Sequence, residues 1–343
     1  SRASAAGGGE RIVLWTAWGA VIGSFLQLAI QLPTVIRVAG RISPSFDHRS
    51  AGTRAVATRF GPAVLSRGVT QIGAFVDTWL ASWLPLGSVA ALANAQMLYT
   101  LPISLFGMSI TAASLPAMAE AAADGVDREA LRASLVGQLA KMAFFVVPSA
   151  VAFGLLGHQV GVLLFQSGAF TAADVRWLWG TLAAAAVGLV PQTWGRLLAS
   201  VHYALGDTRT PLRLAVIRLI GAAGLGAGFA MLGPKALGIS PQWGTAGLAL
   251  GTAVASVLEW RLLSRSVARK IGVVRIGLDR GVRLGAAALL AGAAGWITLV
   301  VLPEAAALVR ATLSLVVFGV VYLGATAVLQ VPEARMLRRA VRP

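Results

Sequence analysis

An apolar stretch early in the chain carries three polar side chains that could bind an ion or a polar ligand. Asp77, Asn94 and Gln96 lie between Phe75 and Pro116, a stretch apolar enough to lie in lipid. An ionised carboxylate in hydrocarbon must pair with a basic group, bind a cation or take up a proton. Amides in such helices contact a polar ligand or, more commonly, a neighbouring helix. The stretch therefore combines a costly charge with two candidate ligand contacts.

Four basic residues also lie within apolar runs, where a positive charge could attract an anionic ligand. They are Arg67, Lys141, Arg196 and Arg218. Each could instead lie near a helix end and extend its charged group to the membrane surface. Arg196 is the strongest candidate for a ligand contact, because it lies well inside its run and follows Pro191. Arg67 comes early in its run, which suits the surface alternative nearly as well.

Asp77 lies deep in its apolar run, so the main question is what neutralises its charge. At helical spacing it shares a face with the small residues Ala74 and Ala81, which leave room beside the carboxylate. Three alternatives stay open: a bound cation, an ion pair with an internal arginine such as Arg218, or contact with water at a helix end.

The composition places the chain in the class of membrane proteins. Hydrophobic residues make up 57% of its 343 residues and charged residues only 12%, about half the charged share of a soluble domain. The net charge of +16 does not indicate nucleic-acid binding, because the basic residues lie between apolar runs and are not interleaved with aromatics. With no Cys and three scattered His, thiolate chemistry is excluded and a histidine metal cluster is disfavoured.

Apolar runs long enough to span a membrane recur along the chain. A spanning helix needs roughly 20 apolar residues, which predicts an all-α, polytopic membrane helix bundle of about nine transmembrane helices. Pro102 and Pro191 lie inside two long runs and predict kinks. The run from His158 to Phe170 is too short to span and predicts an interfacial or re-entrant piece. The predicted spans are Ile12–Leu32, Phe60–Leu84, Ser88–Met118, Leu131–Leu156, Ala173–Leu205, Leu212–Leu232, Trp243–Leu263, Val282–Leu302 and Ala305–Val331.

Basic residues concentrate in alternate loops, which predicts the orientation of the chain. Cytoplasmic loops carry the excess of Lys and Arg. Most of the 29 basic residues fall in one alternate set of loops, which includes Arg261 to Arg283 and the carboxyl end. We therefore expect the amino end outside and the carboxyl end in the cytoplasm. Glu259 precedes a basic helix end and is predicted to be interfacial.

The same runs divide the chain into three parts. We expect residues 1–59 to hold an external strip, one transmembrane helix and a basic cytoplasmic loop, residues 60–263 a core of six transmembrane helices, and residues 264–343 a basic loop and two final helices. The Gly-rich tract from Gly221 to Phe229 predicts close helix packing, since it lacks the preceding strand and following Lys-Ser/Thr pair of a phosphate loop. No pattern typical of catalysis stands out, so we expect that the protein is not an enzyme.

Four segments occur in an order and at a separation that resemble a known family. They are GSVAALANAQMLYTLPISLFGMSITAASLPAMAE, FQSGAFTAADV, YALGDTRTPLRLAV and GTAGLALGTAVAS. Together they resemble the MurJ/MviN lipid II flippases of the MOP exporter superfamily, from about Trp15 to the end of the chain. The resemblance implies a MOP-exporter-like bundle in which the first helices of the amino-terminal lobe are missing from this chain.

The resemblance also implies an activity. A protein of this family would move an undecaprenyl-pyrophosphate-linked peptidoglycan precursor, lipid II, from the inner to the outer leaflet of the bacterial plasma membrane by alternating access. Its partners would be lipid II or a related polyprenyl-pyrophosphate glycolipid, membrane lipids and cell-wall synthesis proteins. The alternatives are a non-transporting scaffold for cell-wall synthesis, a flippase for another lipid-linked oligosaccharide, or a lipid-dependent glycosyltransferase, which would need acidic loops that this chain lacks.

Several residue roles follow from the resemblance alone. In some family members the acid that matches Asp77 helps to hold a sodium ion, the one cofactor to consider, and Thr252 could supply an oxygen. The run Leu212–Leu232 lacks the Asn or Asp that the family often has there, so this ion site is incomplete. Arg196 matches a position that is usually basic.

A departure from the family concerns the head-group contact. The family typically shows an Ala-Asp-Arg-Leu motif whose arginine contacts the head-group phosphate. This chain has Ala-Gln-Met-Leu there, with Met97 in place of the arginine. Asn94 and Gln96 keep hydrogen-bonding capacity but no charge. The resemblance therefore implies that other basic residues hold the head group, or that transport is lost or altered.

Overall fold

The chain forms helices throughout the part that the structure describes. The computed structural model contains no strand within that part, which confirms the all-α prediction. The chain divides into two units, Ser1–Ala57 and Thr58–Pro343. The described residues are 2–39, 68–69, 71–114, 118, 128–166, 170–303 and 306–335.

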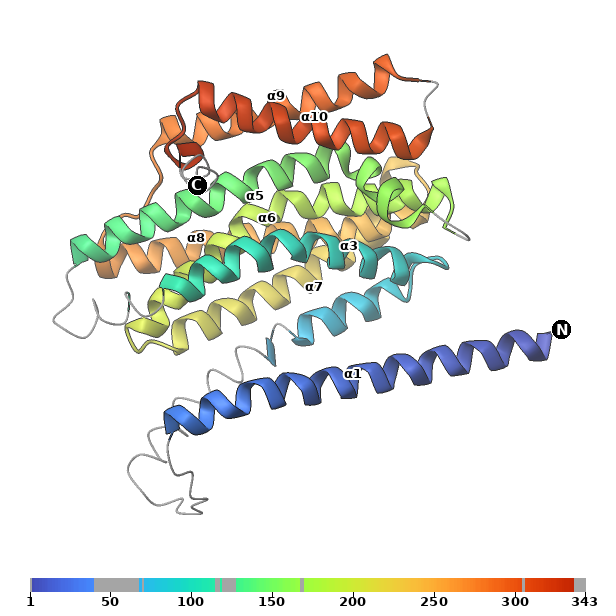
Figure 1. The fold of residues 1–343 in the computed structure, drawn as a ribbon, viewed down its shortest axis with the longest axis horizontal. Coiled ribbons are helices and arrows are strands. Elements are labelled where there is room, and N and C mark those ends of the chain that lie inside the picture. Colours follow the sequence, from blue (N-terminus) through green and yellow to red (C-terminus); the bar gives the residue numbers. More distant parts are fainter. Residues whose placement is uncertain are drawn as a thin grey trace. The chain divides into compact units, whose positions relative to one another are not determined.

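The first unit contains one long helix. Helix α1 runs from Arg2 to Ala39 with Pro33 inside it (Figure 1). Its segment Leu14–Arg37 is long and apolar enough to cross a membrane, as predicted for Ile12–Leu32. Arg37 lies in its last turn, at the start of the predicted basic loop.

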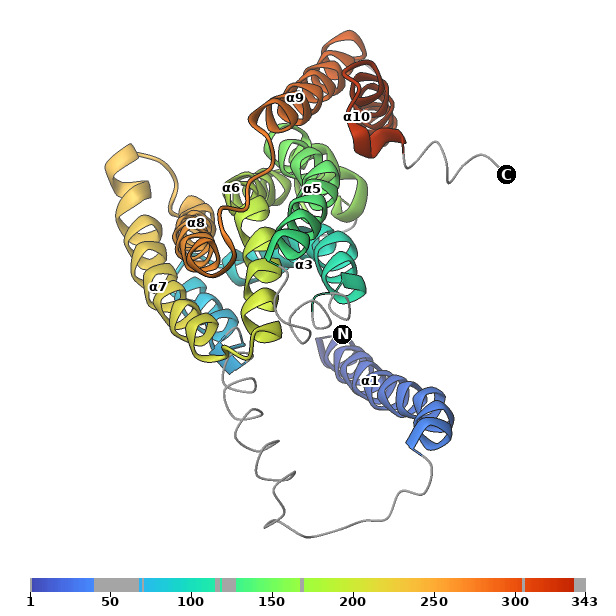
Figure 2. The same ribbon diagram turned by 90° about the vertical axis from the view of Figure 1, so that its left-hand side faces the viewer.

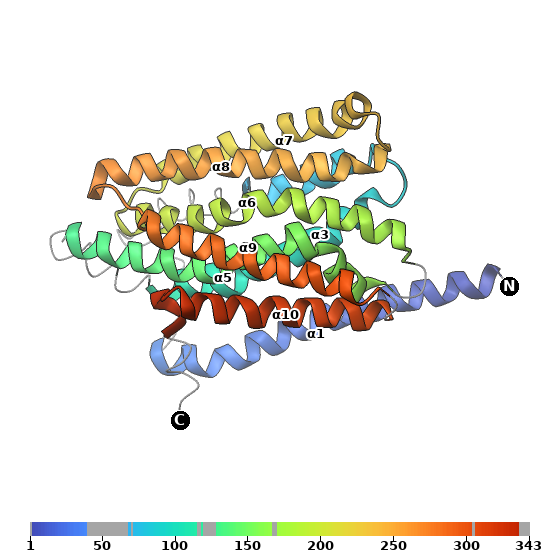
Figure 3. The same cartoon turned by 90° about the horizontal axis from the view of Figure 1, so that it is seen from above.

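The second unit is a bundle of long helices that run back and forth (Figures 1 and 3). Eight helices of the described chain, α1 included, are long and apolar enough to span a membrane. The predicted span Phe60–Leu84 lies partly outside the described residues, and its described part is a helix over 71–81. The other elements are α3 (Ser88–Pro102), η1 (Ile103–Met108), α5 (Arg128–Phe165), α6 (Ala172–Ala204), α7 (Arg209–Leu237), η2 (Pro241–Trp243), α8 (Gly244–Ile271), α9 (Leu278–Val301) and α10 (Ala307–Val328).

Helix α8 organises one side of this unit and α5 the other. Helix α8 packs against both α6 and α7, whereas α5 packs against α6 and against the pair α9 and α10 (Figure 2). Glycines permit the closest approach: a Cβ atom on Gly251 would lie 2.3 Å from the backbone N of Gly226 in α7. This contact confirms the close packing predicted for the Gly-rich tract, because the two backbones meet without a side chain between them.

Two local predictions, a kink at Pro102 and a short piece from His158 to Phe170, can be compared with the structure. Pro102, where a kink was predicted, is followed directly by a π-helical turn, Ile103–Met108, so the regular α-helix is interrupted at this position. The run that begins at His158, predicted to be interfacial or re-entrant, does not form an element of its own, because α5 continues unbroken to Phe165. Trp179 of α6 covers this extension and donates a hydrogen bond from Nε1 to the carbonyl oxygen of Gly154 at 2.9 Å. The helix therefore extends beyond its predicted end, in contact with α6.

The basic residues of the second unit gather at one end. The starts of α5, α7 and α9 and the ends of α6, α8 and α10 lie together there (Figures 1 and 3). We call this the basic end. The alternation of charge predicted from the sequence is thus present in the described part of this unit. The basic end carries Arg128, Arg132, Arg209, Arg213, Arg261, Arg265, Arg269, Lys270, Arg275, Arg280, Arg283 and Arg335.

Candidate functional site

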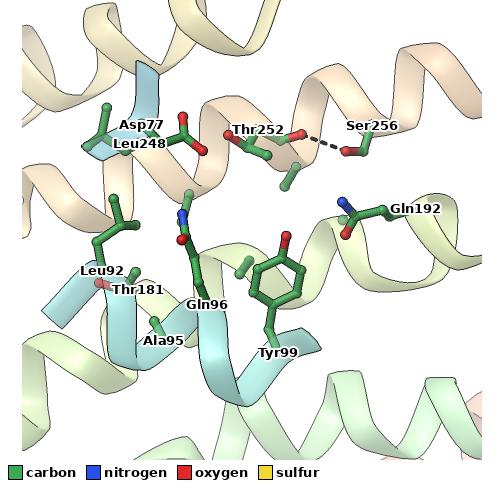
Figure 4. Close-up of a pocket in the computed structure, with 14 residues that line it drawn as sticks. Asp77, Leu92, Ala95, Gln96, Tyr99, Thr181, Gln192, Leu248, Thr252 and Ser256 are labelled. Carbon is green, nitrogen blue, oxygen red and sulfur yellow. Dashed lines mark hydrogen bonds between the residues drawn. The ribbon is translucent and has the colours of Figure 1, made fainter. Parts of the chain in front are cut away.

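A small cavity with both polar and apolar lining residues lies in the second unit, between the 71–81 helix, α3, α6 and α8. Its volume is about 30 Å³, enough for roughly two water molecules or one small ion. Figure 4 shows Asp77 and Thr252 on one side of it and Gln96 and Tyr99 on the other, with Gln192 farther along α6. The structure therefore brings together three residues that the sequence singled out, and adds Tyr99 and Gln192.

Packing of the flanking residues holds Asp77 at this cavity. Leu80 and Ala81, one turn later in the same helix, are buried against Leu92 of α3 and Leu248 of α8. Asp77 lies on the same face at helical spacing, so its carboxylate points toward α8 (Figure 4).

The cavity offers oxygen ligands but little charge. Thr252 Oγ1 is buried and has no hydrogen-bond partner among the described residues. Figure 4 shows the Asp77 carboxylate directed toward Thr252, and the Gln96 amide extends into the same space. These oxygens are of the kind that hard cations prefer. Asp77 is the one acidic residue among the cavity's lining residues, and α7 contributes no side chain to it. The donor set therefore fits a small cation held weakly.

The predicted alternative of an ion pair between Asp77 and Arg218 is wrong. Arg218 Nε on α7 instead lies 3.0 Å from Glu259 Oε2 on α8. The two side chains are 12% and 17% exposed, so both charged groups are mostly buried between helices. Within the described chain Asp77 forms no ion pair. The rotation of α7 and α8 about their axes decides this pairing, and hydropathy does not reveal it.

Arg196 joins this pair to form a charged cluster. It lies on α6 with an exposed side chain, and its positive charge stabilises the Glu259 carboxylate. We call Arg196, Arg218 and Glu259 the charged cluster. These three residues carry two positive charges and one negative charge, so together they have a net positive charge.

The charged cluster and the cavity lie next to each other along the same helices. Gln192 and Ser256 line the cavity, and Arg196 and Glu259 follow them by four and three residues on α6 and α8. Residues at these spacings are neighbours on one helix face, about 5–6 Å apart. The cavity and the charged cluster are therefore neighbouring sites, one helical turn apart on α6 and α8.

The comparisons with known proteins agree on one family. A family model described as lipid II flippase MurJ matches residues 5–319. The chain belongs to this lipid II flippase family. The match covers most of the chain and includes every residue of the cavity and of the charged cluster.

Relatives and one solved structure show how much of the family's length is present. The "Probable lipid II flippase MurJ" of Vibrio cholerae is 28% identical over 249 residues, 73% of this chain and 45% of that protein. The lipid II flippase MurJ of Burkholderia cenocepacia is 29% identical over 208 residues, 60% of this chain and 40% of that protein. A structure of lipid II flippase MurJ in an inward closed conformation has a TM-score of 0.67 at 21% identity, and covers 90% of this chain and 60% of that one. The chain thus spans about half the length of these curated relatives and shares the MurJ fold.

The other residues singled out from the sequence lie away from the cavity of this MurJ-family chain. Asn94 is half-buried on α3 and does not line it. Met97 is 64% exposed, and Lys141 is exposed on α5. Arg67 lies outside the described residues.

Sequence reasoning missed four polar residues that line the cavity of the MurJ-family site, Tyr99, Thr181, Gln192 and Ser256, although the spacing of three of them gave a signal. Tyr99 follows Gln96 by three residues, and Ser256 follows Thr252 by four; Gln192 precedes Arg196 by four. Each is thus one turn from a residue already identified. The hydroxyl of Ser256 donates to the carbonyl oxygen of Thr252 at 2.8 Å, so its donor is already used within α8.

The GDTRTP segment, which carries part of the family resemblance, forms a junction at the basic end. The carboxylate of Asp207 accepts hydrogen bonds from Lys270 Nζ at 2.6 Å and from the backbone N–H of Thr210 at 3.0 Å, and it lies 3.1 Å from Nδ1 of buried His202. Burial raises the pKa of Asp207, but the hydrogen bonds from Lys270, Thr210 and His202 outweigh it and hold this pKa well below its usual range. This junction ties the α6–α7 connection to the end of α8.

Proposed function

We propose that this chain works as part of a flippase that moves lipid II from the inner to the outer leaflet of the bacterial plasma membrane by alternating access. The observation that carries the proposal is the family match over residues 5–319, supported by the MurJ fold. Transport makes and breaks no covalent bond, so no catalytic residue is assigned. A multi-pass membrane protein suits this activity, because its substrate is itself a membrane lipid.

The charged cluster is the part of this chain best suited to the head group. A lipid-linked sugar pyrophosphate has a strongly hydrated anionic head that cannot cross hydrocarbon unaided. Arg218 is engaged by Glu259 and mostly buried, whereas the side chain of Arg196 is exposed on α6, where an anionic head group can reach it. The cavity at Asp77, at about 30 Å³, is far too small for a sugar. We therefore assign the head group to the side of Arg196 and a small cation to the side of Asp77.

Substitution of Arg196 in the full-length protein tests this proposal. Arg196→Ala should abolish the growth of a flippase-depleted strain that depends on the protein, whereas Arg196→Lys should largely retain it, because the charge is kept. Arg213→Ala, which removes an exposed arginine of α7 at the basic end, is the matched control and should support growth. Equal growth of all three variants at normal protein levels would contradict a head-group role for Arg196.

A second candidate function rests on Met97. This position is apolar and 64% exposed, whereas the resemblance implies an arginine there. A non-transporting scaffold that binds cell-wall synthesis proteins would tolerate the absence of an arginine at this position. In a flippase for another lipid-linked oligosaccharide, the apolar side chain could contribute to substrate specificity. If the scaffold were correct, the Arg196 variants would leave growth unchanged while deletion of the protein would still impair cell shape.

We also propose that the basic end and the carboxyl terminus face the cytoplasm, because cytoplasmic loops carry the excess of basic residues. Val273, 56% exposed at this end, is a suitable reporter in a chain without native Cys. Val273→Cys should be labelled by a membrane-impermeant thiol reagent only after the cells are opened. Labelling of Val273→Cys in intact cells would show that the basic end faces outward and would contradict the proposed orientation.

A further inference from the structure

A hollow at the end of α8 gathers three arginines from two segments of the chain. Its volume is about 630 Å³, much larger than the cavity at Asp77. We call it the arginine hollow. Its lining consists of Ser264, Arg265, Ala268, Arg269, Val273, Val274 and Arg275.

The local fold explains why these arginines converge. Arg265 and Arg269 are four residues apart on α8 and so share one face. Helix α8 ends at Gly272, whose φ of 91° is readily adopted only without a side chain. The chain then continues without helix from residue 272 to 277. Val274 and Ile276 pack against the core, and since side chains alternate in an extended chain, Arg275 is exposed between them.

The charges of the hollow are not neutralised within the described chain. Arg265, Arg269 and Arg275 form no ion pair there. Nearby basic residues of the same end do have acidic partners: Lys270 pairs with Asp207, Arg280 with Glu333 and Arg283 with Asp279. Like charges at a spacing of four residues repel each other. Three arginines without acidic partners in the described chain, on a backbone held in place by the packing of Val274 and Ile276, therefore favour a bound anion.

We propose that the arginine hollow binds the phosphate-bearing head group of an anionic phospholipid at the membrane surface. Arginines at helix ends beside the membrane attract such lipids, and their planar groups match phosphate oxygens. Val273, which is 56% exposed, and Ala268 add apolar surface for the glycerol and the first carbons of the acyl chains. Free phosphate would not need this surface. The site is separate from the charged cluster, so the proposal does not depend on the transport activity.

Lipid retention by the purified full-length protein tests the site. The protein is placed in nanodiscs of phosphatidylcholine with increasing phosphatidylglycerol, and the phosphatidylglycerol molecules that remain bound are counted by native mass spectrometry. An arginine that lies beside the bound phosphate group contributes roughly fivefold to lipid binding. The triple variant Arg265→Gln, Arg269→Gln and Arg275→Gln should therefore lose roughly 100-fold in affinity, and the single variant Arg269→Gln roughly fivefold.

A matched control separates this site from general charge attraction. The triple variant Arg128→Gln, Arg209→Gln and Arg213→Gln removes the same charge from exposed positions of the same end and should retain phosphatidylglycerol like the unchanged protein. Equal losses in both triple variants would contradict a specific site. Displacement of the lipid by millimolar inorganic phosphate alone would show a phosphate site and overturn the lipid assignment. If the triple variant does not fold, equal retention by Arg269→Gln and the unchanged protein would also contradict the proposal.

Discussion

The cavity at Asp77 and the charged cluster lie one helical turn apart on α6 and α8, and each contains one carboxylate. The two carboxylates differ in whether a basic side chain is in contact with them. Glu259 is held by Arg218 at 3.0 Å, whereas Asp77 faces the unbonded hydroxyl of Thr252 and forms no ion pair within the described chain. A carboxylate whose charge is matched by a neighbouring helix contributes to the fold. One whose charge is unmatched is available to a ligand. From this difference we expect the cavity to respond to ions and the ion pair of the cluster to hold α7 and α8 together.

The largest effect is expected from breaking the pair in the charged cluster. Glu259→Gln leaves Arg218, which is 12% exposed, without its counter-charge, and loss of one partner of a buried pair costs about 3–5 kcal/mol. We expect a value near the lower limit, about 3 kcal/mol, because Arg196 can move away and water can reach the unpaired charge of Arg218. Thermal melting of the purified full-length protein measures the change.

A double-mutant cycle provides the control for this prediction. Combining Glu259→Gln with Arg218→Gln should restore much of the lost stability, because neither charge is then left alone. Strictly additive losses in the double variant would show that the two residues are not coupled.

A smaller effect is expected at the junction of the basic end, where Asp207 is paired like Glu259 but more accessible. Hydrogen bonds to a charged group contribute about 1.5–3 kcal/mol, and Asp207→Asn should lose a value near the lower limit because the side chain is 22% exposed. Because the pKa of Asp207 is lowered in the folded protein, this stability is present above the unfolded pKa of about 4 and is lost as the pH falls below it.

Melting temperatures between pH 7 and pH 3 check this dependence. The unchanged protein should lose stability more steeply toward low pH than Asp207→Asn does, since the variant has no carboxylate to protonate. Identical pH profiles of the two proteins would contradict a lowered pKa at Asp207. Asp174→Asn, which alters an acid at the opposite end of α6, is the control for a general effect of removing an acid.

The smallest effect on the fold is expected at the cavity. Asp77→Asn keeps an oxygen and removes a charge that forms no ion pair among the described residues and on which Arg218 acts only at longer range, so stability should change by less than about 1 kcal/mol. One carboxylate with two neutral oxygens makes a weak cation site, and we expect at most a small sodium-specific rise in melting temperature.

Melting curves in sodium and in potassium or choline at equal ionic strength decide this point. A large rise that is specific to sodium and disappears in both Asp77→Asn and Thr252→Val would show a strong sodium site and so sharpen the contrast with the charged cluster. A loss of several kcal/mol of stability in Asp77→Asn without any ion dependence would instead mean that Asp77 stabilises the fold. The cavity and the charged cluster would then not differ in the way described.

The sequence by itself determined the class of protein, the spans and the end at which the basic residues gather. These properties depend on local composition, since roughly 20 apolar residues in succession form a spanning helix whatever their neighbours are. The sequence also predicted the close packing of α7 and α8, because glycines at high density in a span serve few other purposes. It identified Asp77, Thr252 and Gln96 before their proximity was known.

Only the tertiary structure decided which of these residues are partners. Whether Arg218 pairs with Asp77 or with Glu259 depends on how α7 and α8 are rotated about their axes. A helix that is apolar on most of its faces can be recognised as a span, but its sequence pattern does not show which face meets which neighbour. The continuation of α5 past His158 was likewise not evident from the pattern along the chain, and Trp179 of α6 packs beside it. The arginine hollow requires a glycine turn that returns Arg275 to the side of Arg265 and Arg269. Pairing and enclosure arise between helices, so they follow from packing and not from the pattern along one helix.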